Sequence, residues 1–438
     1  MKKVRWMMPG LAMLISTYIR AQEVPLTLHD AVEATLRNNK EIILSGFDEE
    51  IARAKYRQTD AVFLPQIKLS YTGMSTNNPL NAFGFKLQQQ TIAPSDFNPE
   101  TLNHPAATQN FITKAEWQQP LINPDQFYRR QAALEQVQVY VFRSKRTKEY
   151  LSLQTQTAYA QLYLAWQAAR VMEEVSRAVD ALYIDTHNRM EKGYLQKSDV
   201  LHVQVEQSAA AARLAEARSN IRNVSDQLSL LMGASAGIVY TVDTLVQVNI
   251  VADTALLVPD NRADFQAMQA AVVAQEKMIC ASKLNYIPRL NAFGEYLIND
   301  RQALGFGANA YLVGAQLSWT LFNGLSTRYK IAEQQAERNK TVELLSYQKS
   351  QAQQGLYKAN RQLKDARFTL QQTEIAAQQA AEALRILQNR YQQGLVTVRD
   401  LLQAQALVSE QKLRQAQAIF LYNTTVAYIQ FLTSTSEK

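Results

Sequence analysis

The chain contains an internal sequence repeat. Residues 189–201 return as residues 390–402, with their arginine, glycine, aspartate and final leucine each displaced by 201 positions. The same offset continues on either side, and residues 63–67 match residues 286–290 at an offset of 223. A duplication of this length constrains the fold, because a structure that the first copy adopts has to suit the second copy as well. The sequence therefore predicts two repeats, 22–250 and 251–438.

The first repeat is the longer one. The offset falls from 223 to 200 between Tyr71 and Phe111, which places about 23 extra residues in this interval. The insert contains Pro79, Pro94 and Pro99 together with several asparagines. Because such clusters are typical of turns and loops, we expect the insert to form a long exposed loop.

Both repeats have the same internal order. Each opens with a helix that a proline ends, at residues 28–63 and 263–286. Two segments that alternate between apolar and polar residues follow. Each repeat then has a long proline-free helical stretch, a glycine turn and a returning helix. The long stretches cover 125–192 and 325–393, and the returning helices cover 198–232 and 399–433.

The alternating segments carry aromatic residues on their apolar side. In residues 310–321, for example, Tyr311, Val313 and Trp319 fall on the face opposite Gly314, Gln316 and Ser318. The strands alone fit a lipid-facing barrel and a half-buried soluble sheet equally well. In the first alternative, the lipid-facing aromatic residues are Tyr71, Trp117, Tyr296, Tyr311 and Trp319.

The long helical stretches favour the membrane alternative. Each would extend over roughly 100 Å at the rise of an α-helix. Their apolar residues are mostly small and are mixed with Gln, Glu and Arg. This composition suits helices that pack side by side into a wall, whereas the competing interpretation is a long coiled-coil dimer.

Several classes of protein are excluded by simpler features. Residues 1–21 have basic residues before a short apolar stretch, which is typical of a secretory signal peptide. The full chain has a net charge of +7, but the remainder has only +3, which argues against a nucleic-acid partner. A single cysteine, Cys280, excludes a disulfide framework, and the four histidines lack metal-ligand spacing. We expect no metal, no cofactor and no enzymatic activity.

Four strands per chain cannot close a membrane barrel, for which at least eight are needed. No stretch after residue 21 is long and apolar enough for a transmembrane helix. We therefore expect an oligomer, and three copies would supply twelve strands.

From about Leu26 to Leu432, the sequence resembles the TolC-like outer membrane efflux proteins. The resemblance rests on the duplicated order, on the strand entry 64–67, on the strand exits 119–123 and 321–324, and on the two glycine turns. It implies a mainly α fold with a small β part, in which a homotrimer forms a twelve-stranded transmembrane β-barrel and a periplasmic α-helical barrel. It also implies a location in the cell outer membrane and docking of the helical tips to a periplasmic adaptor protein.

The resemblance implies site residues at the helical tips. The expected adaptor contacts are Gly193 and Gly394 together with the apolar residues beside them, which we expect to be exposed: Tyr194, Leu195, Leu395 and Val396. The expected pore constriction comprises Asp199, Asp400, Gln403, Tyr391 and Arg399. Thr397 and Asp400 also fit a helix capping box, whereas Gln196 stands in the threonine position of the first copy, so capping does not explain both aspartates. Val396 replaces the arginine of the family's closing network, and Arg399 or Lys197 is expected to substitute for it.

The resemblance implies an exit duct of a tripartite efflux pump, which passively exports small molecules when docked to an adaptor and an inner-membrane transporter. An exit duct of a type I protein secretion system has the same architecture and stays an alternative. A soluble periplasmic coiled-coil scaffold is the alternative from a different class.

Overall fold

A computed structural model describes residues 23–242 and 256–435. The predicted signal peptide at 1–21 and the predicted repeat boundary at 250 lie outside these residues. Among the helices that are described, none combines the length and the apolar character needed to cross a membrane.

The chain divides into two compact units, and each unit takes segments from both repeats. The helical unit comprises residues 23–43, 147–242, 256–259 and 352–434. The sheet unit comprises residues 44–146 and 260–351. Two long helices, α5 (Pro124–Glu191) and α8 (Ser326–Gln392), contribute to both units.

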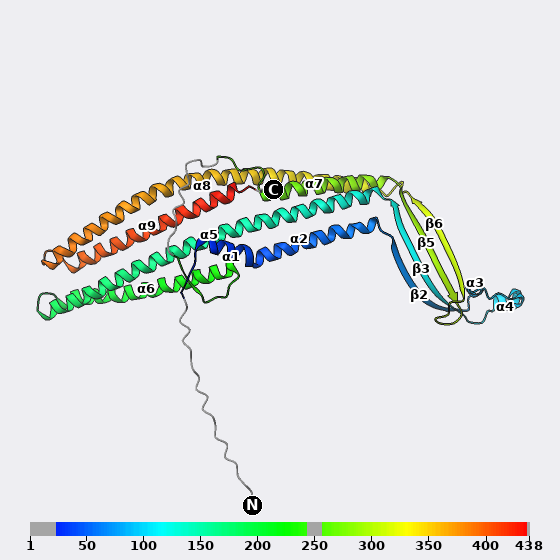
Figure 1. The fold of residues 1–438 in the computed structure, drawn as a ribbon, viewed down its shortest axis with the longest axis horizontal. Helices are drawn as coiled ribbons and strands as arrows, with labels where there is room; N and C mark the ends of the chain where they lie inside the picture. The colour runs from blue at the N-terminus through cyan, green and yellow to red at the C-terminus, as the bar shows by residue number, and fades with distance from the viewer. Residues whose placement is uncertain (1–22, 243–255, 436–438) are drawn as a thin grey trace, which may run out of the picture. The chain divides into compact units, whose positions relative to one another are not determined.

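The helical unit consists mainly of two hairpins. In each hairpin a long helix turns sharply into a returning helix, which is α6 (Lys197–Met232) after α5 and α9 (Val398–Thr433) after α8 (Figure 1). The predicted bounds of these four helices are confirmed to within one or two residues. Helix α1 (Leu28–Asn38) joins the unit, as does a parallel pair of short strands, β1 (Glu23–Pro25) and β4 (Val239–Thr241).

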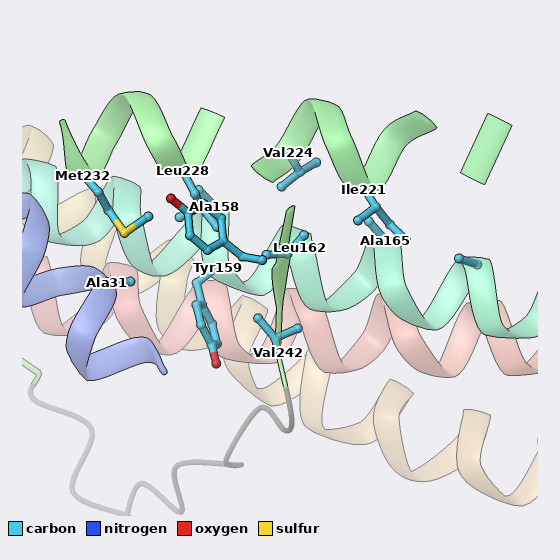
Figure 2. Close-up of a cluster of buried hydrophobic side chains, with 12 residues drawn as sticks. Ala31, Ala158, Tyr159, Leu162, Ala165, Ile221, Val224, Leu228, Met232 and Val242 are labelled. Atoms are coloured by element: carbon cyan, nitrogen blue, oxygen red, sulfur yellow. The ribbon is translucent and has the colours of Figure 1, made fainter. Parts of the chain in front are cut away.

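A cluster of buried side chains holds α1, α5, α6 and β4 together (Figure 2). Alanines at 158 and 165 leave room for Ile221 and Leu228 of α6. Two aromatic residues of α5 also bind backbone carbonyls: Tyr159 Oη donates to Leu26 O at 3.0 Å, and Trp166 Nε1 donates to Tyr240 O at 2.9 Å. These bonds hold the short strands β1 and β4 in place. Each strand has three residues, which is too few for a sequence pattern to predict it.

The predicted first helix at 28–63 is interrupted. Asn39 separates α1 from α2 (Lys40–Gln58) because its backbone is extended and its side chain donates to Leu231 O at 2.7 Å. A 3₁₀ turn at Thr59–Val62 then leads to the sheet. In the second repeat α7 (Ala263–Lys283) is followed by a 3₁₀ turn at Leu284–Tyr286.

The sheet unit contains one antiparallel sheet of four strands in the order β2-β3-β5-β6. Each repeat supplies one hairpin, and the inner strands β3 and β5 join the two hairpins. Strands β2 and β6 form the edges. The bounds are Gln66–Thr76, Thr108–Ile122, Arg289–Asp300 and Ala308–Ser318, in chain order.

The insert of the first repeat is folded, and the prediction of a loop is wrong. It forms α3 (Pro79–Gln88), a 3₁₀ turn (Pro94–Phe97) and α4 (Pro99–Asn103). Each of these three prolines occupies the first position of its helix, where a missing N–H costs nothing and the fixed φ is favourable. Asn78 and Asn98 cap α3 and α4. The residues that indicated a loop are therefore helix starts.

Candidate functional site

Both helical hairpins of the helical unit reverse at a glycine. Gly193 and Gly394 have φ values of +78° and +76°, and nothing lies within 4 Å of the position of a Cβ atom at either of them. In the first turn, Gly193 N donates to Met190 O and Tyr194 N donates to Arg189 O, both at 2.9 Å. The second turn has the same pair of bonds, which is the Schellman pattern of a helix end. Backbone conformation, and not space, is thus the reason for glycine.

Each returning helix begins with an aspartate at its third position. Asp400 accepts from Thr397 N at 2.9 Å and from Thr397 Oγ1 at 2.7 Å, and Thr397 Oγ1 accepts from Asp400 N in return. These bonds hold the pKa of Asp400 below its usual range. Asp199 accepts from Gln196 N at 3.2 Å. The expectation that capping does not explain both aspartates is wrong, because a carboxylate can cap the backbone without a threonine partner.

A buried apolar cluster connects all four helices near the two turns. Val179 of α5, Val203 of α6, Leu384 of α8 and Val398 of α9 belong to it. Tyr391, the expected gate residue, is also a member and is only 6% exposed. The two hairpins therefore pack against each other at this level.

Arg189 covers Tyr391. Its guanidinium lies 4.9 Å from the centre of the Tyr391 ring, and its Nε lies 2.9 Å from Asp185 Oδ2. Burial, followed by the charge of Asp185, raises the pKa of Tyr391 to about 12. Asp185 is close enough for this effect, but the Tyr391 hydroxyl has no hydrogen-bond partner among the described residues. The contact between α5 and α8 here is therefore a cation–π contact supported by an ion pair.

Three of the expected gate residues share a groove between α6 and α9. The groove has a volume of about 640 Å³, and Asp199, Arg399 and Gln403 line it. Its apolar part is formed by Val205, Val398, Leu402 and Ala406, and its charged part also includes His202, Glu206 and Arg213. Asp400 lies on the exposed side of α9 outside the groove lining.

The four expected apolar contact residues at the turns differ in exposure. Tyr194 is 77% exposed and Leu395 is 69% exposed. Leu195 and Val396 are partly buried and pack against the apolar cluster instead. The expectation that all four are exposed is wrong for these two, because the residue that follows each exposed one turns back toward the cluster.

In the sheet unit, the strand register places the expected aromatic residues on one face. Tyr296 is opposite Ala115 and Tyr311, Trp117 is opposite Gly294, and Tyr71 shares this face. Trp319 follows β6, and its Nε1 donates to Tyr286 O at 2.9 Å. The exposed aliphatic residues Ile67, Leu69, Val313 and Leu317 complete this face, which we call the apolar face.

The opposite face, called the polar face here, holds the charged residues of the sheet except Asp300, which lies at the end of β5 on the apolar face. Lys114 Nζ lies 2.6 Å from Glu116 and 2.9 Å from Glu295, and Lys68 lies 3.9 Å from Glu116. These ion pairs run across β2, β3 and β5. Among the described residues, no group of three His, Cys, Asp or Glu side chains could hold a metal ion.

Residues 257–434 match the sequence model of the family described as outer membrane efflux protein. The crystal structure of CusC aligns with a TM-score of 0.79 over 94% of this chain and 93% of CusC, at 14% identity. The predicted resemblance is confirmed.

Two other solved outer membrane proteins have the same fold as this chain. VceC from Vibrio cholerae gives a TM-score of 0.76 at 17% identity, over 94% of this chain and 97% of VceC. The open state of the MtrE outer membrane channel from Neisseria gonorrhoeae gives a TM-score of 0.71 at 14% identity, over 93% of this chain and 88% of MtrE. No curated protein sequence gives a match. The mainly α fold with a small four-stranded sheet is thereby confirmed.

Sequence reasoning missed the arginine at Tyr391. Neither Arg399 nor Lys197, the expected substitutes for the family's arginine, contacts Tyr391, whereas Arg189 does. The internal duplication could have indicated the contact between Arg189 and Tyr391. Arg189 precedes Gly193 by four residues and Tyr391 precedes Gly394 by three, so two matching hairpins place both side chains at the same level.

Proposed function

We propose that three copies of this chain form an outer membrane exit duct of a tripartite efflux pump. The duct passively exports small molecules when a periplasmic adaptor links it to an inner-membrane transporter. The apolar face of the sheet carries the proposal. It extends across all four strands, and the only charged residue that the register places on it is Asp300 at the end of β5, whereas the ion-paired lysines and glutamates lie on the other face.

The exposure of this face favours a lipid environment. On the edge strands Ile67 is 76% exposed and Tyr311 is 79% exposed, and on the inner strands Tyr296 is still 47% exposed. Soluble monomers seldom expose an apolar patch that spans a whole sheet. In a bilayer the same face would be favourable, and aromatic residues near the strand ends would lie at headgroup level.

The two open edges favour an oligomer. Strands β2 and β6 present unpaired backbone groups that cannot stay unpaired in lipid. If β6 of one copy pairs with β2 of the next, three copies close a barrel of twelve strands. The polar face with Lys68, Lys114, Glu116 and Glu295 would then line the water-filled interior.

Fractionation of expressing cells tests this assembly. We expect the protein in the outer membrane fraction, and after detergent extraction we expect an oligomer of three times the chain mass that dissociates on heating. A soluble monomer or dimer would instead support the periplasmic coiled-coil scaffold. It would mean that another protein or another copy covers the apolar face.

We propose that the pore constriction lies at the two turns. Three copies of Asp400, on the exposed side of α9, would form a ring of negative charge that favours cations. Gln403 one turn later adds no charge to this ring. Asp400→Ala should reduce cation selectivity in planar bilayers because the ring of charge is lost, whereas unchanged selectivity would remove Asp400 from the constriction.

Adaptor docking is proposed for the exposed residues of the turns, together with Gly193 and Gly394, which set the shape of the turns. Tyr194 and Leu395 are exposed apolar side chains at the ends of the hairpins, and the groove between α6 and α9 adjoins them. The double variant Tyr194→Ala, Leu395→Ala should weaken binding of a cognate adaptor without changing assembly. Phe368→Ala, which alters an equally exposed aromatic residue on α8, serves as the control. Equal loss in both variants would show that general surface apolarity, and not the tip, binds the adaptor.

A further inference from the structure

The insert of the first repeat is held on one particular face of the sheet. Figure 1 shows α3 at the end of the strands where β2 leads to β3 and β5 leads to β6. In this last part of the strands, Asn110 is 0% exposed, Asn299 is 4% exposed and Ala308 is 3% exposed. All three belong to the polar face by the strand register. Their neighbours Gln109 and Asn309, on the apolar face, are exposed.

The end of α3 is what covers Asn110. Gln89 Nε2 donates to Gln109 O at 2.7 Å and to Asn110 Oδ1 at 3.0 Å. Asn110 Nδ2 donates to Gln88 Oε1 at 3.2 Å and to Asn299 Oδ1 at 3.1 Å. The buried Asn110 amide thus has a partner for its oxygen and two for its nitrogen. A fully satisfied buried network of this kind gives the contact one defined geometry.

The rest of the insert is tied to α3. Lys86 Nζ lies 2.8 Å from Asp96 Oδ1, and Asp96 Oδ2 accepts from Ala93 N at 2.8 Å. Phe83 and Phe97 pack edge to face with ring centres 5.8 Å apart. The insert therefore behaves as a folded piece and not as a loose chain.

We infer that the insert forms a second constriction of the duct, at the end of the barrel opposite the helices, and that it limits the size of molecules that pass this end. This inference rests on the proposed function, because only in a closed barrel does the polar face line the pore. Strands β3 and β5, which carry Asn110 and Asn299, are the inner strands, so the insert lies over the middle of the face and not at an edge between copies. Three copies would bring three inserts over one opening.

The second repeat provides a replacement that removes the insert alone. Its hairpin connects β5 to β6 through residues 301–307, without an insert. Residues 77–107 lie between the paired Thr76 and Thr108, and residues 300–307 lie between the paired Asn299 and Ala308, so replacing the first segment by a copy of the second should preserve the β2 to β3 register. Gln89→Ala, which removes two hydrogen bonds to β3 without shortening the chain, is a milder variant. Leu80→Gln, on the exposed side of α3, is the matched control.

Thiol labelling from outside intact cells measures passage through this end independently of the helical tips. Cys280 is first replaced by alanine, and Thr72→Cys then places one thiol on the polar face of β2. A small maleimide should label this thiol in every variant. A maleimide attached to a long polyethylene glycol chain should fail with the native insert and with Leu80→Gln. With the replaced insert it should label as fast as the small reagent, and with Gln89→Ala it should gain part of that rate.

Two results would contradict the account, and they differ. If the large reagent labels Thr72→Cys equally with and without the insert, the constriction is wrong while the channel stands. If even the small reagent fails in all variants, the polar face does not line an open channel, and both the proposed function and the constriction are wrong. Should the replaced-insert protein fail to assemble, Gln89→Ala alone decides, since no gain of labelling there contradicts the constriction.

Discussion

At the scale of single residues, two aspartates at the glycine turns have both a structural and an electrostatic role. Asp199 and Asp400 cap their helices, and the cap places each carboxylate at the start of a returning helix. A negative charge is stabilised there by the helix dipole as well as by the backbone N–H groups. The carboxylates proposed for the charged ring are therefore already held in place, because the same hydrogen bonds that cap the helices fix their positions.

Arg189→Ala should loosen the contact between α5 and α8. The lost cation–π contact is worth about 0.5 to 2 kcal/mol, and the buried Tyr391 ring loses its cover. Single-channel recordings should show longer or more frequent openings than in the native protein. Tyr391→Phe keeps the ring and removes a hydroxyl without a hydrogen-bond partner, so it should behave like the native protein. More frequent openings in Tyr391→Phe than in Arg189→Ala would show that the Tyr391 hydroxyl, and not Arg189, stabilises the contact.

Alkaline pH should open the same contact. The pKa of Tyr391 is raised from 10.0 to about 12 by burial and by Asp185, so the folded tip favours the neutral phenol. Its contribution to stability is complete below pH 10 and is lost as the pH rises toward 12. Open probability in bilayers should therefore rise over this interval in the native channel and less so in Tyr391→Phe. An identical rise in both would trace the effect to other groups.

At the scale of helices, the turns should be sensitive to a Cβ atom. Gly394→Ala forces a residue with a side chain into a left-handed conformation, which costs about 1 kcal/mol. Gly355 in the middle of α8 is a matched control, because an added Cβ there meets Tyr428 and Leu432 at ordinary contact distances. Gly355→Ala should stabilise α8 by up to about 1 kcal/mol. Denaturant unfolding of the detergent-solubilised protein compares the free energies of unfolding of the two variants. A change of the same sign in both variants would contradict this explanation of the glycine turn.

At the scale of the sheet, the two faces should respond differently to charge. Val313→Lys places a cation on the apolar face in the middle of β6 and should cost about 2 to 4 kcal/mol near the middle of a bilayer. Leu312→Lys, one residue earlier on the polar face, should be tolerated. Yield of the heat-dissociable oligomer in the outer membrane reports the difference. Comparable loss in both variants would mean that the apolar face does not contact lipid.

The helices and strands were predictable because their patterns are long. Proline-free stretches gave α5 and α8, and alternation gave the strands together with the face that carries Tyr296 and Tyr311. The insert was misinterpreted, since Pro79 in isolation indicates a turn and only its asparagine neighbour marks a helix start. Contacts between hairpins, such as Arg189 with Tyr391, depend on packing between segments that are about 200 residues apart in sequence.

At the scale of the whole molecule, opening is a question of populations. A buried apolar cluster and one cation–π contact favour the packed state of the helical hairpins. A ligand can shift this equilibrium only by binding the open state more tightly than the packed state. In the proposed docking, an adaptor would contact the exposed Tyr194 and Leu395, whose neighbours Leu195 and Val396 pack against this cluster.

The most direct test is electrical. The detergent-extracted oligomer is inserted into planar bilayers, and the current and its reversal potential are recorded in a salt gradient. We expect discrete single-channel currents that select for cations, from an oligomer of three times the mass of one chain. A protein that extracts as a soluble monomer or dimer, or an oligomer that carries no current, would contradict this expectation.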